Sequence, residues 1–122
     1  MPKIPYDNLR DFAPVALIAT FPNVLVVPAA SPHKSLADVI AFTRSQPNKM
    51  TFASSGNGSS AHLSGALMNA ETGLKAQHVP YRAIAQGLTD LLSGQIMMMY
   101  YPYSALQGHI QAGKLNVLAV AS

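Results

Sequence analysis

One loop of small polar residues holds the groups best suited to chemistry in this 122-residue chain. Residues 54–60 read Ser-Ser-Gly-Asn-Gly-Ser-Ser, between a short apolar run at 50–53 and an amphipathic run that begins at His62. Where a strand leads through such a loop into a helix, the first N–H groups of the helix lack internal partners, and the helix dipole adds partial positive charge. We therefore expect this loop to bind an anion.

Known phosphate and dinucleotide loops differ from this one. The Lys that follows the second Gly of a P-loop is missing, and the chain has no Gly-x-Gly-x-x-Gly. Ser-Gly-Asn-Gly is also a common turn, and its position between strand and helix is what favours anion binding. His62 lies in the first helical turn, where it either donates to the ligand or the loop, or is simply partly exposed.

Further candidates lie at the ends of other predicted strands. Arg82 either pairs with a ligand carboxylate or is a solvated residue at a strand–helix corner. Tyr101 and Tyr103 are candidates for a pocket mouth, where an aromatic ring packs on a ligand and its hydroxyl donates. Outside the 54–62 segment, the candidate binding residues are Asn23, Tyr81, Arg82, Tyr101 and Tyr103.

Composition and spacing argue against several other chemistries. The chain has no Cys, which excludes disulfides and thiolate nucleophiles. Its four His and five acidic residues show no metal-ligand spacing and no carboxylate pair, and Gly-x-Ser-x-Gly is absent. The eight basic residues are dispersed, so the net charge of +3 does not predict nucleic-acid binding. We expect no metal, no cofactor and no catalytic residue.

Length and hydropathy predict a single domain over residues 1–122. Hydrophobic residues make up 49% of the chain, enough for a core, but no run reaches the ~18–20 apolar residues of a membrane span. Met1–Pro5 lacks the basic and apolar regions of a signal peptide. The expectation is either a cytoplasmic protein or a piece of a longer one.

Hydrophobic periodicity predicts alternating strands and helices after an extended lead-in at 1–14. The predicted strands are 15–19, 24–27, 50–53, 77–80, 95–100 and 115–121, and the predicted helices are 36–46, 60–72, 83–92 and one after Pro102. Ser35 and Asp38 indicate a capping box at the first helix. Leu63, Ala66, Leu67 and Ala70 are the predicted buried stripe of the second helix, and residues 97–99 and Tyr100 are predicted in the core.

This order favours an α/β fold: a three-layer sandwich with a mainly parallel sheet and helices on both faces. Ligands of such sheets bind at the carboxyl ends of the strands. Four loops are therefore candidates for the site: 54–60, 80–83, 100–103 and, if that end faces the same way, 20–23.

Several segments in this order resemble the Bug family, the substrate-binding proteins of tripartite tricarboxylate transporters, also called TctC. The segments are Tyr6-Asp7, 11–15 (Asp-Phe-Ala-Pro-Val), 22–27 (Pro-Asn-Val-Leu-Val-Val), 54–63, 78–81 (His-Val-Pro-Tyr), 88–95 and 112–115. Each motif is modest, but their order and spacing cover nearly the whole chain.

The resemblance implies the second lobe of a two-lobe, type II periplasmic binding protein. The family's ligands are small carboxylates, and the protein delivers them to membrane permease subunits. The first lobe, with its Pro-Gly-Gly loop, has no counterpart in this chain. The family's cradle loop holds a ligand carboxylate, which carries over onto Ser54, Ser55, Gly58, Ser59, Ser60 and His62.

Two departures from the family pattern bear on the ligand. The family commonly has Pro-Tyr-Lys-Gly where this chain has Arg82 and Ala83 in the last two positions, and an acidic residue after the strand that here ends at Tyr101. Without that acid, an amino-acid ammonium group lacks its partner. Dicarboxylates, tricarboxylates or aromatic acids are the expected ligands, and weak or no binding is expected from one lobe alone.

Two other classes of function remain open. A small α/β hydrolase-like enzyme would use a Ser of the loop with His62, and Ser59→Ala and Ser60→Ala would then abolish turnover of an ester probe. A self-associating interaction module would use the exposed cleft face or an unpaired edge strand.

Overall fold

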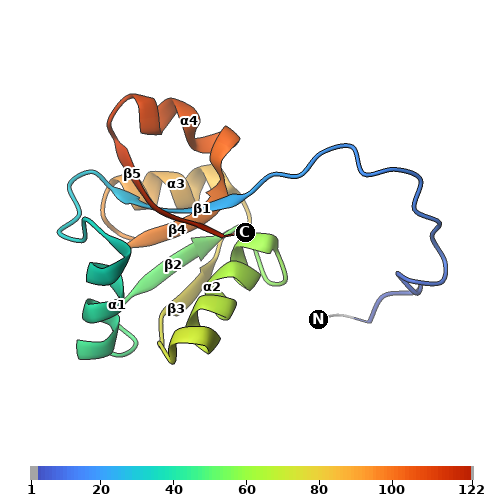
Figure 1. Ribbon diagram of the computed structural model, residues 1–122, viewed down its shortest axis with the longest axis horizontal. Coiled ribbons are helices and arrows are strands. Elements are labelled where there is room, and N and C mark those ends of the chain that lie inside the picture. The colour runs from blue at the N-terminus through green and yellow to red at the C-terminus, as the bar shows by residue number, and fades with distance from the viewer. Residues whose placement is uncertain (1–2, 122) are drawn as a thin grey trace.

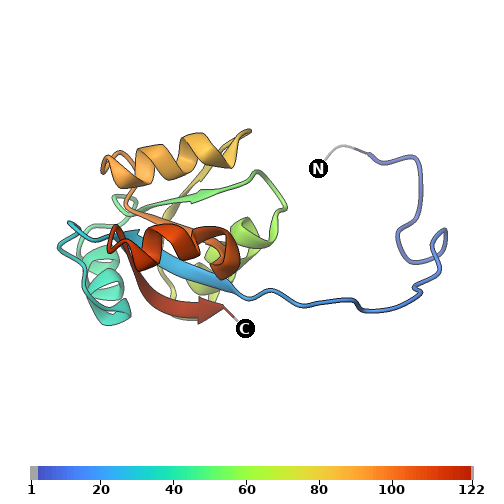
Figure 2. The ribbon, with the colours of Figure 1, turned by 90° about the horizontal axis from the view of Figure 1, so that it is seen from above.

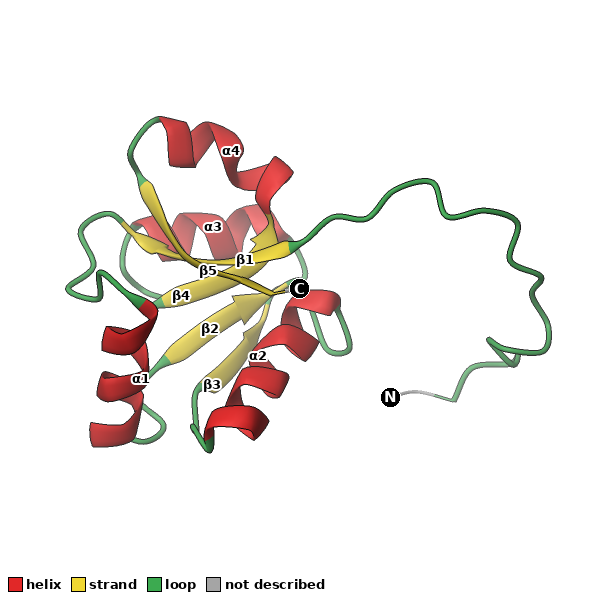
Figure 3. Ribbon diagram, in the orientation of Figure 1, coloured by secondary structure: helices red, strands yellow, loops and turns green. Residues whose placement is uncertain are grey.

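The computed structural model, which describes residues 3–121, is a five-stranded sheet with helices on both faces (Figure 1, Figure 3). In chain order the elements are β1 (Asn23–Pro28), α1 (Leu36–Ser45), β2 (Thr51–Ser54), α2 (Ser60–Thr72), β3 (Gln77–Pro80), α3 (Ile84–Leu92), β4 (Met98–Pro102), α4 (Tyr103–Gln111) and β5 (Leu115–Ala121). The predicted α/β class is confirmed.

The strands lie in the order β3-β2-β4-β1-β5. β2 is parallel to both β3 and β4, whereas β1 is antiparallel to its two neighbours, β4 and β5. Four strands therefore share one direction and β1 alone is reversed, which confirms the mainly parallel sheet.

Two apolar clusters make the three layers. On one face, α1 and α2 cover a cluster that contains Leu25, Phe52 and Tyr100. On the other face, α3 and α4 cover a cluster that contains Val26, Ala53 and Met99 (Figure 2). Met98, Met99 and Tyr100 are at most 4% exposed, so the core assignment of this strand is confirmed.

Local capping signals form as the sequence predicts. Ser35 Oγ accepts from the N–H of Asp38, and the Asp38 carboxylate accepts from the N–H of Ser35, which completes the capping box of α1. α2 ends at Gly73, whose φ of 68° is left-handed and costs glycine little.

The predicted strand at 15–19 is wrong. Residues 3–22 contain no helix or strand, and Val15 and Ile18 are 98% and 96% exposed. Figure 2 shows this N-terminal arm running away from the sheet. A run of apolar residues needs a partner strand to become a strand itself, and no described residue supplies one. The predicted 95–100 strand is also shifted, to Met98–Pro102.

The predicted buried stripe of α2 is wrong as well. Leu63 and Leu67 are 58% and 60% exposed, and the residues of α2 that are buried are Ala61 and Gly65. A Cβ at position 65 would overlap the Phe52 ring. The helix therefore lies close to the sheet at Gly65, and Leu63 and Leu67 point outward, whereas Met68 packs against the core cluster.

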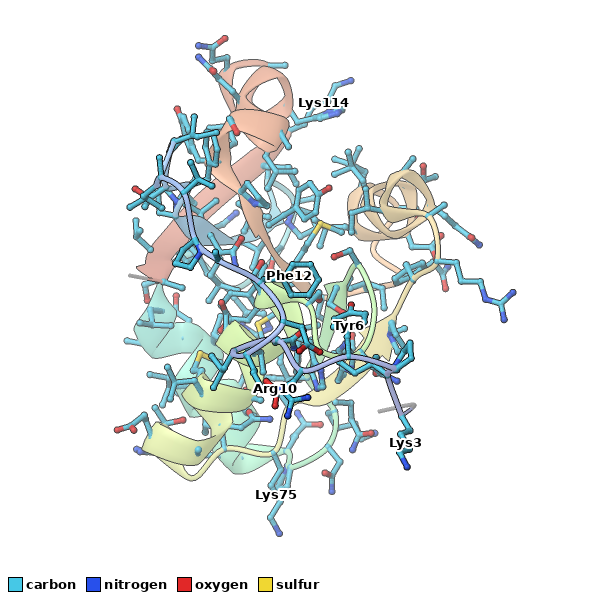
Figure 4. The ribbon with its side chains drawn as sticks, turned by 90° about the vertical axis from the view of Figure 1, so that its right-hand side faces the viewer. Lys3, Tyr6, Arg10, Phe12, Lys75 and Lys114 are labelled. Atoms are coloured by element: carbon cyan, nitrogen blue, oxygen red, sulfur yellow. The ribbon has the colours of Figure 1, made fainter. Side chains whose placement is uncertain are left out.

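Figure 4 shows the basic side chains Lys3, Arg10, Lys75 and Lys114 spread from the arm to opposite ends of the body. The described residues contain one salt bridge, between Arg10 and Asp11 in the exposed arm (3.3 Å). These four basic residues thus form no single patch.

Candidate functional site

The four predicted loops meet at one edge of the sheet. Ser54 is opposite Pro80 at the ends of β2 and β3, and Asn23, the first residue of β1, is opposite both Pro102 and Ala121. The reversed direction of β1 therefore brings loop 20–23 to the same edge as loops 54–60, 80–83 and 100–103.

The 54–60 loop is folded by its own polar groups. Gly56 and Gly58 have φ values of 123° and 80°, which give the chain its sharp turn. Ser59 Oγ donates to the carbonyl of Gly56 (2.8 Å) and accepts from the N–H of His62 (3.2 Å), which caps α2. Ser59 is therefore the N-cap of α2.

Three backbone N–H groups of the loop remain available. Among the hydrogen bonds between described residues, none uses the N–H of Ser55, Asn57 or Ser60. All three residues are exposed, and Ser60 is the first residue of α2. The positive end of the α2 dipole and these donors lie together, an arrangement that favours a small anion.

Sequence reasoning missed one member of the site, His78 on β3. Its Nε2 lies 2.6 Å from Ser54 Oγ, and its ring stacks on the ring of His62 with centroids 3.9 Å apart and planes 8° apart. Position 78 stands on a strand beside the loop-bearing strand, and the register that pairs β2 with β3 appears only in the fold.

The environment of this pair disfavours a positive charge. Burial, followed by the charge of His62, holds the pKa of His78 below its ordinary value of 6.5. The N–H of Gly58 donates to His62 Nδ1 (3.0 Å), which requires an unprotonated Nδ1. The site therefore offers neutral donors in place of a cation.

Tyr81 and Arg82 follow β3 and point in different directions. The N–H of Tyr81 donates to the carbonyl of Ser54 (3.0 Å), and its hydroxyl donates to Asp90 on α3 (2.7 Å). Burial and this hydrogen bond raise the pKa of Tyr81 to about 12. Arg82 is exposed at the corner. The Tyr81 hydroxyl is therefore already paired within the protein.

The other two candidate tyrosines, Tyr101 and Tyr103, line different grooves from the one that Ser60 lines. Tyr101 is half-buried against the cluster under α3 and α4. Tyr103 is 41% exposed and lines an apolar groove of ≈ 520 Å³ together with Phe21 and Val120.

Asn23 connects the loop end of the sheet to a second groove. Its side-chain amide donates to Ser64 Oγ on α2 (3.4 Å), and it lines a groove of ≈ 460 Å³ between α2 and β5. Ser60 and Ser64 also line this groove, with Leu63, Leu67 and Val120 among its apolar residues. This groove thus combines a few polar groups with an apolar wall.

Within residues 3–121, no cluster of three or more His, Cys, Asp or Glu residues is arranged to hold a metal ion. No helix among those residues has the length and hydropathy needed to cross a membrane.

The family model described as "Tripartite tricarboxylate transporter family receptor" (TctC) matches residues 1–122. A UPF0065 protein from the tcbD–tcbE intergenic region of Pseudomonas sp. (strain P51) is 40% identical over 121 residues, or 99% of this chain and 36% of that protein. BugT of Bordetella pertussis is 34% identical over 122 residues, which cover 100% of this chain and 37% of BugT.

Solved structures with ligands are also similar to this chain. R. palustris Rpa4515 with adipate has a TM-score of 0.85 and 36% identity, over 96% of this chain and 39% of that protein. MatC from Rhodopseudomonas palustris with bound malate has a TM-score of 0.86 and 26% identity, over 99% and 41%. The chain thus spans somewhat more than a third of the length of these relatives. By its sequence and its fold, the chain belongs to the TctC (Bug) family of solute-binding proteins.

Proposed function

We propose that this chain is the carboxylate-binding second lobe of a two-lobe solute-binding protein. The observation that carries this proposal is the loop at 54–60: it ends a strand, begins a helix, and lies at the edge of the sheet where four loops meet. Its serines, its free N–H groups and the α2 dipole suit a carboxylate bound by neutral donors. Rpa4515 with adipate and MatC with malate support this class of ligand.

The ligand-contacting residues proposed for this lobe fall into two groups. The first group is the loop and first helical turn, which would hold the carboxylate. The second group lies at the neighbouring strand ends, where side chains would face the remainder of the ligand. The proposed residues are Ser54, Ser55, Gly58, Ser59, Ser60 and His62 in the first group, and Asn23, Tyr81, Arg82, Tyr101 and Tyr103 in the second.

The remaining contacts would come from outside these 122 residues. The relatives are almost three times as long as this chain, because the chain covers 36% and 37% of two of them. We propose that the other lobe supplies the opposite wall of the cleft, in the periplasm, and that closure of the lobes signals to the permease subunits of a tripartite transporter. One lobe then makes half of the contacts and binds weakly on its own.

The contact between Ser54 and His78 has the distance of a nucleophile and its base, yet it is poorly placed for catalysis. Ser54 is 0% exposed, and its Oγ also contacts both the N–H and the carbonyl of Gly56. His78 stacks on His62, and no described carboxylate orients it. We assign this contact to holding the loop in shape.

Titration of the isotope-labelled chain with adipate and with malate, followed by amide NMR shifts, tests the proposal. We expect shifts at Asn57, Ser60 and His62, with millimolar affinity, and a several-fold weaker affinity for Ser60→Ala. Ser93→Ala, an exposed serine at the end of α3, is the matched control and leaves the affinity unchanged. Shifts elsewhere on the chain, or none at saturating adipate and malate, would reject the proposed site, and micromolar affinity would contradict the half-cleft.

A further inference from the structure

Two histidines far apart in sequence form one unit beneath the loop. His62 belongs to the first turn of α2 and His78 to β3, and their rings lie parallel at 3.9 Å. Phe52 of β2 packs against His78 from within the core, with centroids 5.2 Å apart. The pair therefore joins the start of α2 to the sheet at the point where the loop turns.

The hydrogen-bond partner of His62 fixes its tautomer. Because the N–H of Gly58 donates to Nδ1, a neutral His62 carries its proton on Nε2. A second proton would place an N–H at Nδ1, directly opposite the N–H of Gly58. Protonation of His62 therefore replaces a hydrogen bond within the loop with a repulsive contact.

The three contacts of Ser54 are all satisfied by a proton on Nε2 of His78. Ser54 Oγ accepts from the N–H of Gly56 (3.1 Å) and donates to the carbonyl of Gly56 (3.1 Å). Its single proton is then in use, so the short contact to His78 is satisfied when Nε2–H of His78 donates to Oγ (2.6 Å). His78 thus holds the serine that begins the turn, and its own ring keeps His62 in place.

We propose that His78 is a positioning residue for the loop. The stacked pair keeps the loop closed, with Gly58 bonded to His62 and Ser54 bonded to His78, only while both rings are neutral. Acid then opens the loop and weakens anion binding. This sign is opposite to that of a site in which an imidazolium ion binds the anion directly, where affinity rises as pH falls. The statement about ligand rests on the proposed function, whereas the statement about the loop does not.

The groups that face the pair leave its charge uncompensated. β2 presents Phe52 and the neutral Ser54, and the loop residues 55–60 carry no titratable side chain. The charged residues of the adjoining elements are Glu71 in the last turn of α2, Lys75 between α2 and β3, and Arg82 after β3. All three are exposed, and none forms a salt bridge among the described residues. A charge on one ring disfavours a second charge on the other, because the ring centroids lie only 3.9 Å apart.

NMR of the free chain from about pH 8 to about pH 5 tests the closed loop without any ligand. We expect neutral His62 and His78 to carry their protons on Nε2, as read from imidazole nitrogen shifts. The amide proton of Gly58 is expected to lose its hydrogen-bonded shift on acidification. A Gly58 amide that is insensitive to pH, or a proton on Nδ1 of neutral His62, would overturn the proposal.

A second experiment repeats the adipate titration at about pH 8 and at about pH 5. We expect affinity to fall by about three- to tenfold on acidification, the equivalent of one lost hydrogen bond. Unchanged or increased affinity in acid would overturn the coupling. Absence of adipate shifts at either pH would instead reject the proposed function, and the Gly58 result would still decide whether the pair holds the loop.

Variants at position 78 separate positioning from general stability. His78→Phe keeps a ring for stacking and removes the donor to Ser54, so we expect adipate affinity to fall several-fold at about pH 8. His78→Gln supplies an amide N–H, and partial recovery of affinity is expected. His109→Gln on α4 is the control and changes neither affinity nor the Gly58 amide. Full affinity in both variants would show that His78 does not position the loop.

Discussion

Two regions differ in whether their side chains find partners within this chain: the loop with its two histidines, and the outer apolar surface. We use the term outer apolar surface for Leu63, Leu67 and Val120, which are all at least 58% exposed. In the loop, polar groups pair with one another: Ser59 with Gly56 and His62, and Ser54 with Gly56 and His78. The outer apolar surface is open, although its residues are of the type that normally forms a core.

The two regions share one helix, which makes their difference instructive. α2 begins in the loop with Ser60, packs small residues on Phe52, and turns Leu63 and Leu67 outward. The side chains of the loop find polar partners within the loop, in the first turn of α2 and on β3. Exposed apolar side chains can be covered only by another domain or another chain. The relatives are almost three times as long and so have further chain that could cover this surface.

The largest effect is expected where α2 packs on the sheet. Gly65→Ala places a Cβ against the ring of Phe52, which is 1% exposed and also contacts Tyr100 and His78. We expect a loss of about 1–3 kcal/mol in the free energy of unfolding, measured with urea and circular dichroism. Because Phe52 supports His78, the loop amides should shift as well.

Gly108→Ala is the matched control for this change. Gly108 also lies within a helix, α4, but a Cβ there has no neighbour within 4 Å. Replacing glycine with alanine in an open helix position should stabilise the chain by about 0.5–1 kcal/mol. Equal stability of the two variants would show that the inner face of α2 is loosely packed, contrary to the comparison drawn above.

A smaller effect is expected from pH, and it is confined to the loop side. His78 has an ordinary pKa of 6.5 when unfolded and a lowered pKa when folded. Between these two values the unfolded chain binds more protons, so stability falls as pH drops below about 6.5 and levels off below the folded pKa. Urea midpoints measured across this range should show the fall, and His78→Gln should reduce its slope.

His109→Gln, on α4, is the control for this pH series and should leave the slope unchanged. Asp38 gives a second check, because hydrogen bonds from Lys34 and Ser35 lower the pKa of its carboxyl below 3.8. The contribution of Asp38 to the free energy of unfolding is lost only in stronger acid, as its carboxyl protonates in the folded state. If stability falls only in the acidic range where Asp38 protonates, protonation of His78 does not affect the free energy of unfolding.

Sequence reasoning succeeded where the signal was local. The capping box at Ser35, the bounds of α2, β3 and β5, and the loop at 54–60 all depend on residues close together in the chain. It failed where the outcome depended on distant partners. The arm at 15–19 has strand-forming residues but no strand beside it, and His78 meets Ser54 only through the register of β2 with β3.

The prediction of which face of α2 is buried was wrong for a different reason. A 3.6-residue period identifies an apolar face, yet it does not say whether that face meets this domain or another one. The clash between a Cβ at Gly65 and Phe52 decides the question, and it is visible only in the packed helix.

The smallest effect on stability, and a larger one on association, is expected at the outer apolar surface. Leu63→Ser and Leu67→Ser remove exposed side chains, so the free energy of unfolding should change by no more than about 0.5 kcal/mol each. If this surface covers a second copy when no other lobe is present, sedimentation velocity should show dimers that the double variant loses. Leu92→Ser, on α3 and 37% exposed, is the same substitution on the opposite layer and should leave the dimers intact. A chain that stays monomeric at every concentration would contradict self-association, and a loss of stability as large as that of a buried leucine would show that α2 packs its outer face within the monomer.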